Sequence, residues 1–270
     1  MIAGLFGALL GLGGGFILIP FFTLVLGINI KYAIGASLVS VIATSSGAAA
    51  TYVKDRMTNI RVALFLEIGT TLGAISGVIL AAYLEPAALY LLFAVFLGWS
   101  ALAMLRKKET QGGQVIVKPD ALADRLRLHS AYPGGPNHEM ISYRVTHSQL
   151  GLALMYVAGC VSALLGIGSG ALKVPAMDQA MKIPIKVSSA TSNFMIGVTA
   201  ATSAGVYFIR GDIIPGLAGP VALGVLVGSR VGSRFLTAWS GRTVRVIFVV
   251  TLFIVAIQMG VTGVRSLLTN

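Results

Sequence analysis

The sequence predicts an all-α, polytopic membrane protein made of two homologous four-segment repeats. Three observations lead to this fold class. Of 270 residues, 56% are hydrophobic and 11% are charged, whereas a soluble domain carries roughly 25% charged residues. Apolar segments recur along the whole chain, and the mean hydropathy is +0.88. The two halves of the chain also match each other without a gap at an offset of 155 residues.

Each repeat opens with an apolar segment that glycines interrupt and a proline follows. The first copy reads GLGGGFILIP from Gly11 to Pro20, and the second reads GIGSGALKVP from Gly166 to Pro175. We therefore expect one structural module, present twice, whose copies both begin with a broken helix. Further residues recur unchanged at the same offset, namely Ile28, Ile30, Lys31, Ser37, Thr44, Tyr52, Gly69, Gly73 and Gly77.

The first broken segment, residues 1–27, has flanks of about ten residues on either side of its glycines. Ten residues make roughly 15 Å of helix, which reaches the middle of a bilayer but does not cross it. The matching segment of the second copy is residues 149–181. Met1 aligns with Tyr156, although the second copy's apolar segment begins near Gln149. The first half-helix is therefore expected either to be short or to begin upstream.

Six unbroken apolar stretches of 19–23 residues are long enough to span a bilayer. Glycines at every fourth position, as in Gly69, Gly73 and Gly77, predict that these helices pack closely. The stretches are Ala33–Val53, Val62–Leu84, Ala87–Leu105, Val187–Ile209, Ile213–Phe235 and Val246–Val264.

A basic linker, residues 106–147, separates the first repeat (residues 1–105) from the second (residues 148–270). It carries seven Lys and Arg residues against four acidic ones. Pro119–His129 is expected to form a short amphipathic helix with Leu122, Leu126 and Leu128 on one side, and Tyr132–Asn137 to form a turn. Its three histidines are nine residues apart, which fits no compact metal site. The sequence thus predicts neither a metal nor a cofactor.

Two topologies are compatible with the repeats. If both broken segments cross the membrane, eight spans result, the repeats are parallel, and Lys and Arg divide twelve to five between the two sides. If both segments re-enter, six spans result, the repeats are inverted, and the division is fourteen to three. The positive-inside rule favours inverted repeats, with parallel repeats as the alternative. The linker is cytoplasmic in both.

The two glycine breaks are the candidate binding site. Irregular backbone at membrane depth must be buried in protein or line a wet cavity, and paired discontinuous helices indicate a transporter site. Helix N-termini and open glycine N–H groups favour an anion. Tight helix packing and interhelical bonding are the structural alternatives. The candidate substrate-binding residues are Gly13, Gly14, Gly15, Ser37, Thr44, Gly168, Ser169, Gly170, Lys173, Ser192, Asn193 and Thr199.

Lys173 is the deepest charge in the sequence, and its counterpart in the first copy is Leu18. An ionisable residue inside a membrane segment indicates function, here neutralisation of the anion; a structural pair with Asp178, or snorkelling to an interface, is the alternative. Glu67, Asp178 and Arg230 are candidates for charge or proton coupling. The chain shows no nucleophile–base set and no P-loop, which argues against an enzyme. Cytoplasmic loops and an anionic substrate explain the net charge of +11 better than nucleic acid does.

The doubled motif resembles the TauE/SafE sulfite exporter family. The resemblance rests on the glycine–proline motif followed by Lys31 and Ser37, and on its repeat with Lys186 and Ser192, and covers both membrane halves. It implies a permease of the bacterial inner membrane for a small sulfur-containing anion such as sulfite or an organosulfonate. Partners would be that anion and membrane lipid, and a homodimer is left open. An anion channel, or a scaffold or receptor that acts through the linker, are the rival functions.

Overall fold

The computed structural model describes residues 1, 3–5, 7, 14–106, 120–133, 140–168, 170–235 and 241–268. Two predicted site residues, Gly13 and Ser169, lie outside these described residues, as does most of the first glycine run.

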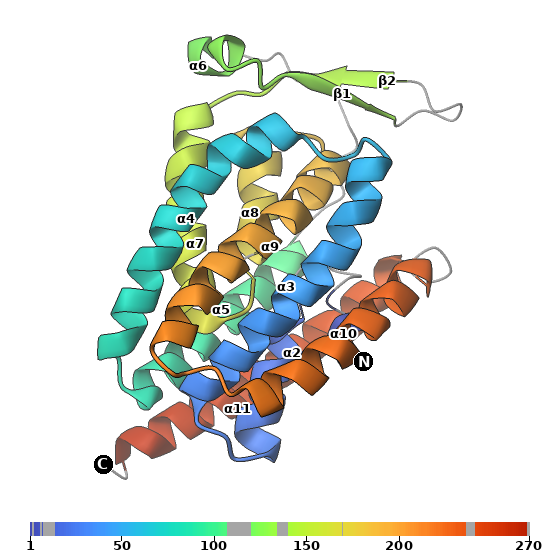
Figure 1. Ribbon diagram of the computed structural model, residues 1–270. Helices are drawn as coiled ribbons and strands as arrows, with labels where there is room; N and C mark the ends of the chain where they lie inside the picture. The colour runs from blue at the N-terminus through green and yellow to red at the C-terminus, as the bar shows by residue number, and fades with distance from the viewer. Residues whose placement is uncertain are drawn as a thin grey trace.

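The described chain is dominated by helices, and this confirms the predicted all-α fold class (Figure 1). Each of the six predicted unbroken stretches is a helix. The first half contains α2 (Gly15–Pro20), η1 (Phe21–Val25), α3 (Ile30–Lys54), α4 (Ile60–Tyr83) and α5 (Pro86–Arg106). The second half contains α7 (Ser148–Leu165), α8 (Gly170–Pro175), η2 (Ala176–Ala180), α9 (Ile185–Ile209), α10 (Pro215–Phe235) and α11 (Gly241–Leu268).

Matching elements of the two halves begin at the same offset. The elements α8, η2, α9, α10 and α11 each start 155 residues after α2, η1, α3, α4 and α5. In both halves a proline, Pro20 or Pro175, ends a six-residue helix and a π-helical turn follows. Proline lacks the N–H that an α-helical ladder needs, and a widened turn is one way to continue past it.

The helices α3 and α9 run in opposite directions (Figure 1). Gly35, near the start of α3, packs against backbone of Asp212, which follows the end of α9. At the other end, the backbone N–H of Asn59, beyond α3, donates to Thr191 Oγ1 near the start of α9. These two contacts fix the antiparallel arrangement.

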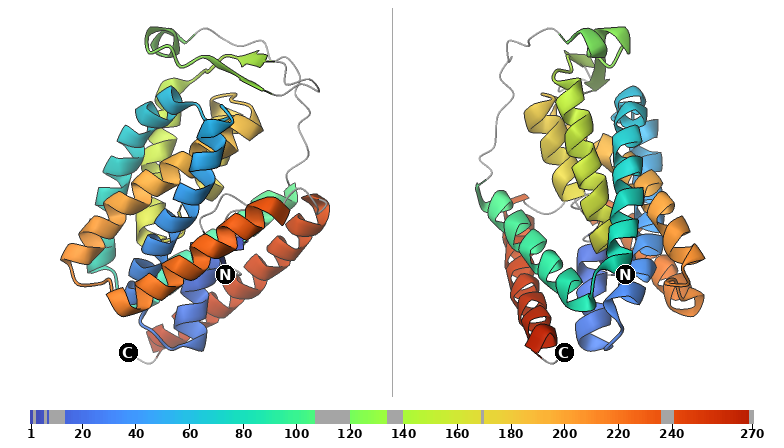
Figure 2. Two further views of the ribbon diagram at one scale, coloured as in Figure 1. Left: turned by 45° about the vertical axis from the view of Figure 1, so that its right-hand side comes forward. Right: turned by 90° about the vertical axis from the view of Figure 1, so that its left-hand side faces the viewer.

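Glycines allow α4 and α7 to approach backbone to backbone, as their spacing predicts. Gly73 packs against the carbonyl of Tyr156, and Gly69 and Gly77 do the same with Leu152 and Cys160. A Cβ at any of these glycines would overlap the facing carbonyl. The pair α5 and α11 lies side by side (Figure 2), with Gly263 against Leu91.

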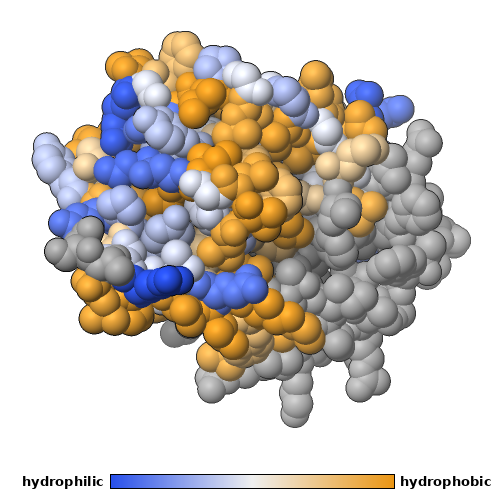
Figure 3. Space-filling model, turned by 90° about the horizontal axis from the view of Figure 1, so that it is seen from below, coloured by the Kyte–Doolittle hydropathy of each residue, from blue (hydrophilic) through white to orange (hydrophobic). Residues whose placement is uncertain are grey.

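Four described helices are long and apolar enough to cross a membrane: Ile30–Lys54, Ile60–Tyr83, Ser148–Leu165 and Lys186–Ile209. On α4, the face away from the glycines exposes Leu64, Ile68, Leu72 and Ile79, at the three- and four-residue spacing of one helix face. Seen from below, hydrophobic residues cover continuous areas of the described surface (Figure 3). These features fit a multi-pass membrane protein.

The linker forms a small cap at one end of the helices (Figure 1). It contains α6 (Ala121–Arg125) and an antiparallel hairpin of β1 (Ser130–Pro133) and β2 (Met140–Tyr143). The predicted helix over Pro119–His129 was too long. Arg127, two residues beyond α6, has a left-handed backbone conformation with a φ of 51°, so the helix does not continue through it. As a result Leu128 turns inward and is buried while Leu126 is exposed.

Candidate functional site

The two glycine breaks touch each other in the interior. Gly15, the first residue of α2, packs against the carbonyl of Gly166 and the Cα of Ile167. Ser37 on α3 donates its hydroxyl to the same Gly166 carbonyl at 2.8 Å. A side chain at Gly15 would overlap both groups. The sequence therefore needs glycine here because two backbones from different halves meet.

At the second break, which follows α7, the backbone takes up left-handed conformations. Gly166 has a φ of 64° and donates its N–H to the carbonyl of Ser162 at 2.8 Å, which is how left-handed glycines commonly end helices. Gly168 is also left-handed, at 82°, and α8 restarts at the buried Gly170. In the first half, Gly14 has a φ of 77° and precedes α2.

Lys173 lies on α8 directly after this break, and its side chain is fully buried. Its ammonium donates to Thr199 Oγ1 on α9 at 2.6 Å. The same hydroxyl lies 2.7 Å from Glu67 Oε1 on α4. The acidic group that acts on the Lys173 charge is thus Glu67. One hydroxyl links a buried cation and a buried anion that come from different halves of the chain.

The Thr199 hydroxyl has two acceptors but only one proton to donate. One acceptor is Glu67 Oε1, and the other is the Met195 carbonyl of its own helix, at 2.9 Å. Among the described residues, the second carboxylate oxygen, Glu67 Oε2, is buried without a hydrogen-bond partner, and so is Ser192 Oγ, two turns before Thr199. Buried polar atoms without partners are rare and require an explanation.

The charged pair has no equivalent in the other half. The residues at the matching positions are Leu18 and Ala222. Thr44, which matches Thr199, is buried and donates to the Ser40 carbonyl of its own helix, at 2.9 Å. The repeats thus supply a similar framework twice, and the second break carries the charge.

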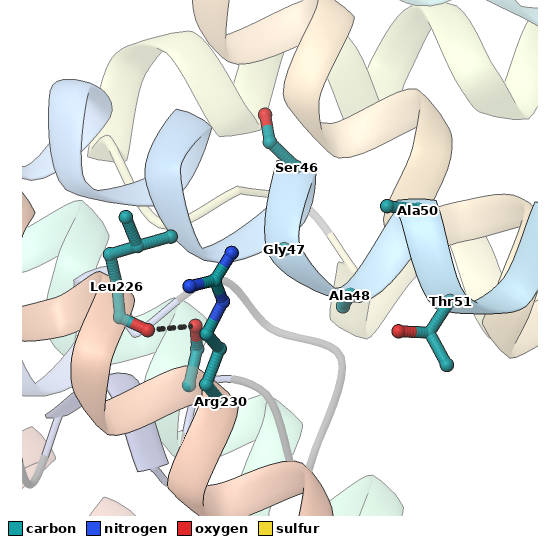
Figure 4. A pocket seen from close by; sticks show the side chains of 8 residues that line it. Ser46, Gly47, Ala48, Ala50, Thr51, Leu226 and Arg230 are labelled. Atoms are coloured by element: carbon teal, nitrogen blue, oxygen red, sulfur yellow. Dashed lines mark hydrogen bonds between the residues drawn. The ribbon is translucent and has the colours of Figure 1, made fainter.

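Other predicted residues lie elsewhere or bond locally. Asn193 is buried, but its amide donates to the Ser189 carbonyl one turn earlier, at 3.0 Å. Asp178 lies on η2 and is partly exposed. Arg230 is exposed on α10 and lines a cavity of about 380 Å³ between α10 and α3 (Figure 4). The other lining residues are Ser46, Gly47, Ala48, Ala50, Thr51, Leu226 and Ser229.

Sequence reasoning proposed Glu67 and Lys173 for separate roles and missed that they share a partner. The sequence does carry a signal for the pair, because each charge matches an apolar residue in the other copy: Lys173 matches Leu18, and Glu67 matches Ala222. Asn59 was also missed. Its side chain caps α4 by accepting from Val62 N and donates to the Leu128 carbonyl at 2.9 Å and to Tyr143 Oη at 2.7 Å.

The linker packs over the end of the helices that carry Glu67 and Lys173. Leu128 and Val145 share one apolar cluster with Leu66 of α4 and Met177 of η2. The Thr146 N–H also donates to the Met181 carbonyl at 3.1 Å. Within the described residues, no group of three or more His, Cys, Asp or Glu side chains is placed to hold a metal ion.

Apolar helices long enough to cross a membrane and a buried charged pair at a helix break fit a membrane transporter, and comparisons with known proteins agree. The profile of the family "Sulfite exporter TauE/SafE" matches residues 1–259. The chain therefore belongs to the TauE/SafE family, as its motif indicated.

Two relatives carry the name of a membrane transporter. The chain is 26% identical over 273 residues to the "Probable membrane transporter protein YunE" of Bacillus subtilis (strain 168), covering 98% of this chain and 96% of that protein. It is 26% identical over 210 residues to the "Probable membrane transporter protein MJ0441" of Methanocaldococcus jannaschii, covering 76% and 67%. No solved structure matches the chain.

Proposed function

We propose that this membrane transporter is a secondary transporter that moves a small sulfur-containing oxyanion, such as sulfite or an organosulfonate, by alternating access. The observation that carries the proposal is the buried ammonium of Lys173 beside a glycine break. A buried charge is costly and persists in a membrane protein mainly where it has a function. An oxyanion supplies both the opposite charge and several hydrogen-bond acceptors.

Other groups of the second repeat also suit an oxyanion. Ser192 has a free buried hydroxyl, and Thr199 already bonds Lys173. Gly168 and Gly170 leave backbone exposed to a close ligand because they have no side chain. Thr44 and Asn193 bond carbonyl groups of their own helices, so neither needs a substrate oxygen as a partner.

Inverted repeats would provide the alternating access. The antiparallel course of α3 and α9, the shared element boundaries at an offset of 155 residues, and the contact between Gly15 and Gly166 support this arrangement. Transporters with inverted repeats hold their substrate at the repeat interface and rock one repeat against the other. We place the linker on the cytoplasmic side, in keeping with the positive-inside rule.

Counterflow in proteoliposomes tests the proposal. Vesicles loaded with unlabelled sulfite should accumulate labelled sulfite transiently, because a carrier exchanges one anion for another. Lys173→Met should abolish the accumulation, whereas Lys186→Met, a matched change at an exposed lysine, should retain it. Flux without counterflow would indicate a channel. No flux, together with loss of the cellular role on deletion of residues 112–137, would indicate a scaffold.

A further inference from the structure

The charges around Lys173 balance before any substrate arrives. Lys173 contributes one positive charge and Glu67 one negative charge, and Thr199 bridges them. Lys173 is fully buried and Glu67 is 9% exposed. A monovalent anion that binds at Lys173 would leave this interior with one unmatched negative charge. Uncompensated buried charges are strongly unfavourable.

We propose that Glu67 takes up one proton for each monovalent anion that binds at Lys173, so that the transporter carries protons and anions together in a one-to-one ratio. This inference rests on the proposed function and adds to it the coupling ion, the stoichiometry and the residue that carries the proton. The carboxylate accepts the proton at one oxygen and becomes a neutral carboxylic acid, and the anion takes over as the counter-charge of Lys173.

Thr199 provides the switch between the two states. When Glu67 is ionised, the hydroxyl proton of Thr199 points to Glu67 Oε1 at 2.7 Å. When Glu67 is protonated, it no longer needs this donor, and the hydroxyl proton turns to the Met195 carbonyl at 2.9 Å. Both acceptors lie within bonding distance in one geometry. No movement of the helices is needed for this change.

Glu67 Oε2 is the carboxylate oxygen that accepts the proton. It is buried and has no hydrogen-bond partner among the described residues, although an ionised carboxylate normally accepts several bonds. A structural ion pair would be expected to satisfy both oxygens. One oxygen bonded to the Lys173 bridge and one left open suit a group that gains and loses a proton.

The other described ionisable groups on the helices around α4 are exposed, partly exposed or bonded to other residues. On α7, Tyr156 Oη donates to Ser76 Oγ at 2.9 Å, and Cys160 is partly exposed, with its backbone against Gly73 and Gly77. On α9, Tyr207 Oη donates to the Ala163 carbonyl, and Lys186 is exposed. Asp178 of η2 is partly exposed, and in the linker Arg127 is exposed, with its carbonyl accepting from Arg61. Among the described charged groups, Lys173 is thus the one that hydrogen bonds link to Glu67, through Thr199.

Calorimetry on the purified full chain measures the proton count directly. Methanesulfonate and sulfite are titrated in two buffers that differ in ionisation enthalpy, at about pH 6 and about pH 8. Methanesulfonate stays ionised throughout, so a proton taken up with it belongs to the protein. For sulfite, its own titration is subtracted. The same series uses Glu67→Gln and, as a matched control, Glu85→Gln, whose parent residue is exposed.

We expect the wild type and Glu85→Gln to take up about one proton per anion, with affinity falling about tenfold per pH unit on the alkaline side. Glu67→Gln should take up none, and its affinity should not change with pH. Because Gln leaves Lys173 without a counter-charge, an infrared difference spectrum of the wild type provides a measurement without a variant. Anion binding should raise the band of a protonated carboxyl group.

Three results would overturn the inference. Wild-type binding with no proton uptake and no carboxyl band would contradict it while leaving the proposed function intact. Unchanged proton uptake in Glu67→Gln would assign the proton to another group. Absence of binding by both anions would contradict the proposed function, and the inference would fall with it.

Discussion

Lys173 and Glu67 share one hydrogen-bond partner, the hydroxyl of Thr199, at 2.6 Å and 2.7 Å. The ammonium comes from the helix after the second glycine break, and the carboxylate comes from a helix of the first half. The two halves of the chain are thereby joined by charge at a buried point. Neither charge has a counterpart at the matching position of the other repeat, although the threonine does.

A double-mutant cycle on this pair should show strong coupling. Lys173→Met and Glu67→Gln each leave one buried charge unmatched, and each should lower the free energy of unfolding by about 3 kcal/mol. The double variant has no buried charge and should recover most of that loss. Denaturation of the detergent-solubilised protein measures the cycle. Additive losses in the double variant would show that the two charges do not interact.

The bridging hydroxyl should matter more than its repeat counterpart. Thr199→Val removes the bridge between two charges and should cost about 2 kcal/mol, because hydrogen bonds to charged groups are worth more than neutral ones. Thr44→Val removes only a bond to its own helix and should cost less than about 1 kcal/mol. Thr199→Ser should restore most of the stability. Thermal unfolding compares the four proteins, and equal losses at both threonines would contradict the assignment.

The glycine contacts predict opposite effects for the same substitution at different sites. Gly73→Ala places a methyl group into the Tyr156 carbonyl and should destabilise the protein by about 2 kcal/mol. Gly205 on α9 is exposed and has no atom near its Cβ position. Gly205→Ala should therefore gain up to about 1 kcal/mol in helix propensity. Thermal unfolding distinguishes the two, and a stabilised Gly73→Ala would contradict the close packing of α4 and α7.

Asp120 joins the linker to the second repeat. One carboxylate oxygen accepts from Leu122 N and Ala123 N at the start of α6, and the other accepts from the backbone and hydroxyl of Ser148 at the start of α7. Burial acts to raise the pKa of Asp120, but these hydrogen bonds outweigh burial and lower it. Because the folded pKa lies below the unfolded one, the stabilisation is present above about pH 4 and is lost as the pH falls through the folded pKa.

Asp120→Ala should therefore loosen the linker at neutral pH. We expect faster hydrogen exchange at the N-terminal turn of α7 and in α6, with the difference from wild type disappearing at acid pH. Asp124→Ala is the control, since the Asp124 carboxylate bonds His129 within the linker and no described residue of α7. Identical exchange in wild type and Asp120→Ala at neutral pH would show that this carboxylate does not hold the linker.

Helix positions were predictable from the sequence because the length of each apolar segment and the capping residues and prolines at its ends determine them. Asn59 caps α4 and prolines begin α5 and α10, and the repeat places each matching start at the same offset. Tertiary relationships were not predictable in this way. Glu67 and Lys173 are far apart in the chain, and they meet because α4, α8 and α9 cross at one place. The linker hairpin and the inward turn at Leu128 also depend on contacts with α4 and η2 rather than on local pattern.

The central claim is that the buried Lys173 holds a sulfur-containing oxyanion. Its most direct test is anion-induced thermal stabilisation of the purified protein by sulfite, sulfate, thiosulfate and methanesulfonate, with chloride as the reference. The wild type should be stabilised by at least one of these anions. The double variant Glu67→Gln, Lys173→Met should fold but show no shift with that anion. An equal shift in the double variant would place the anion elsewhere and contradict the account.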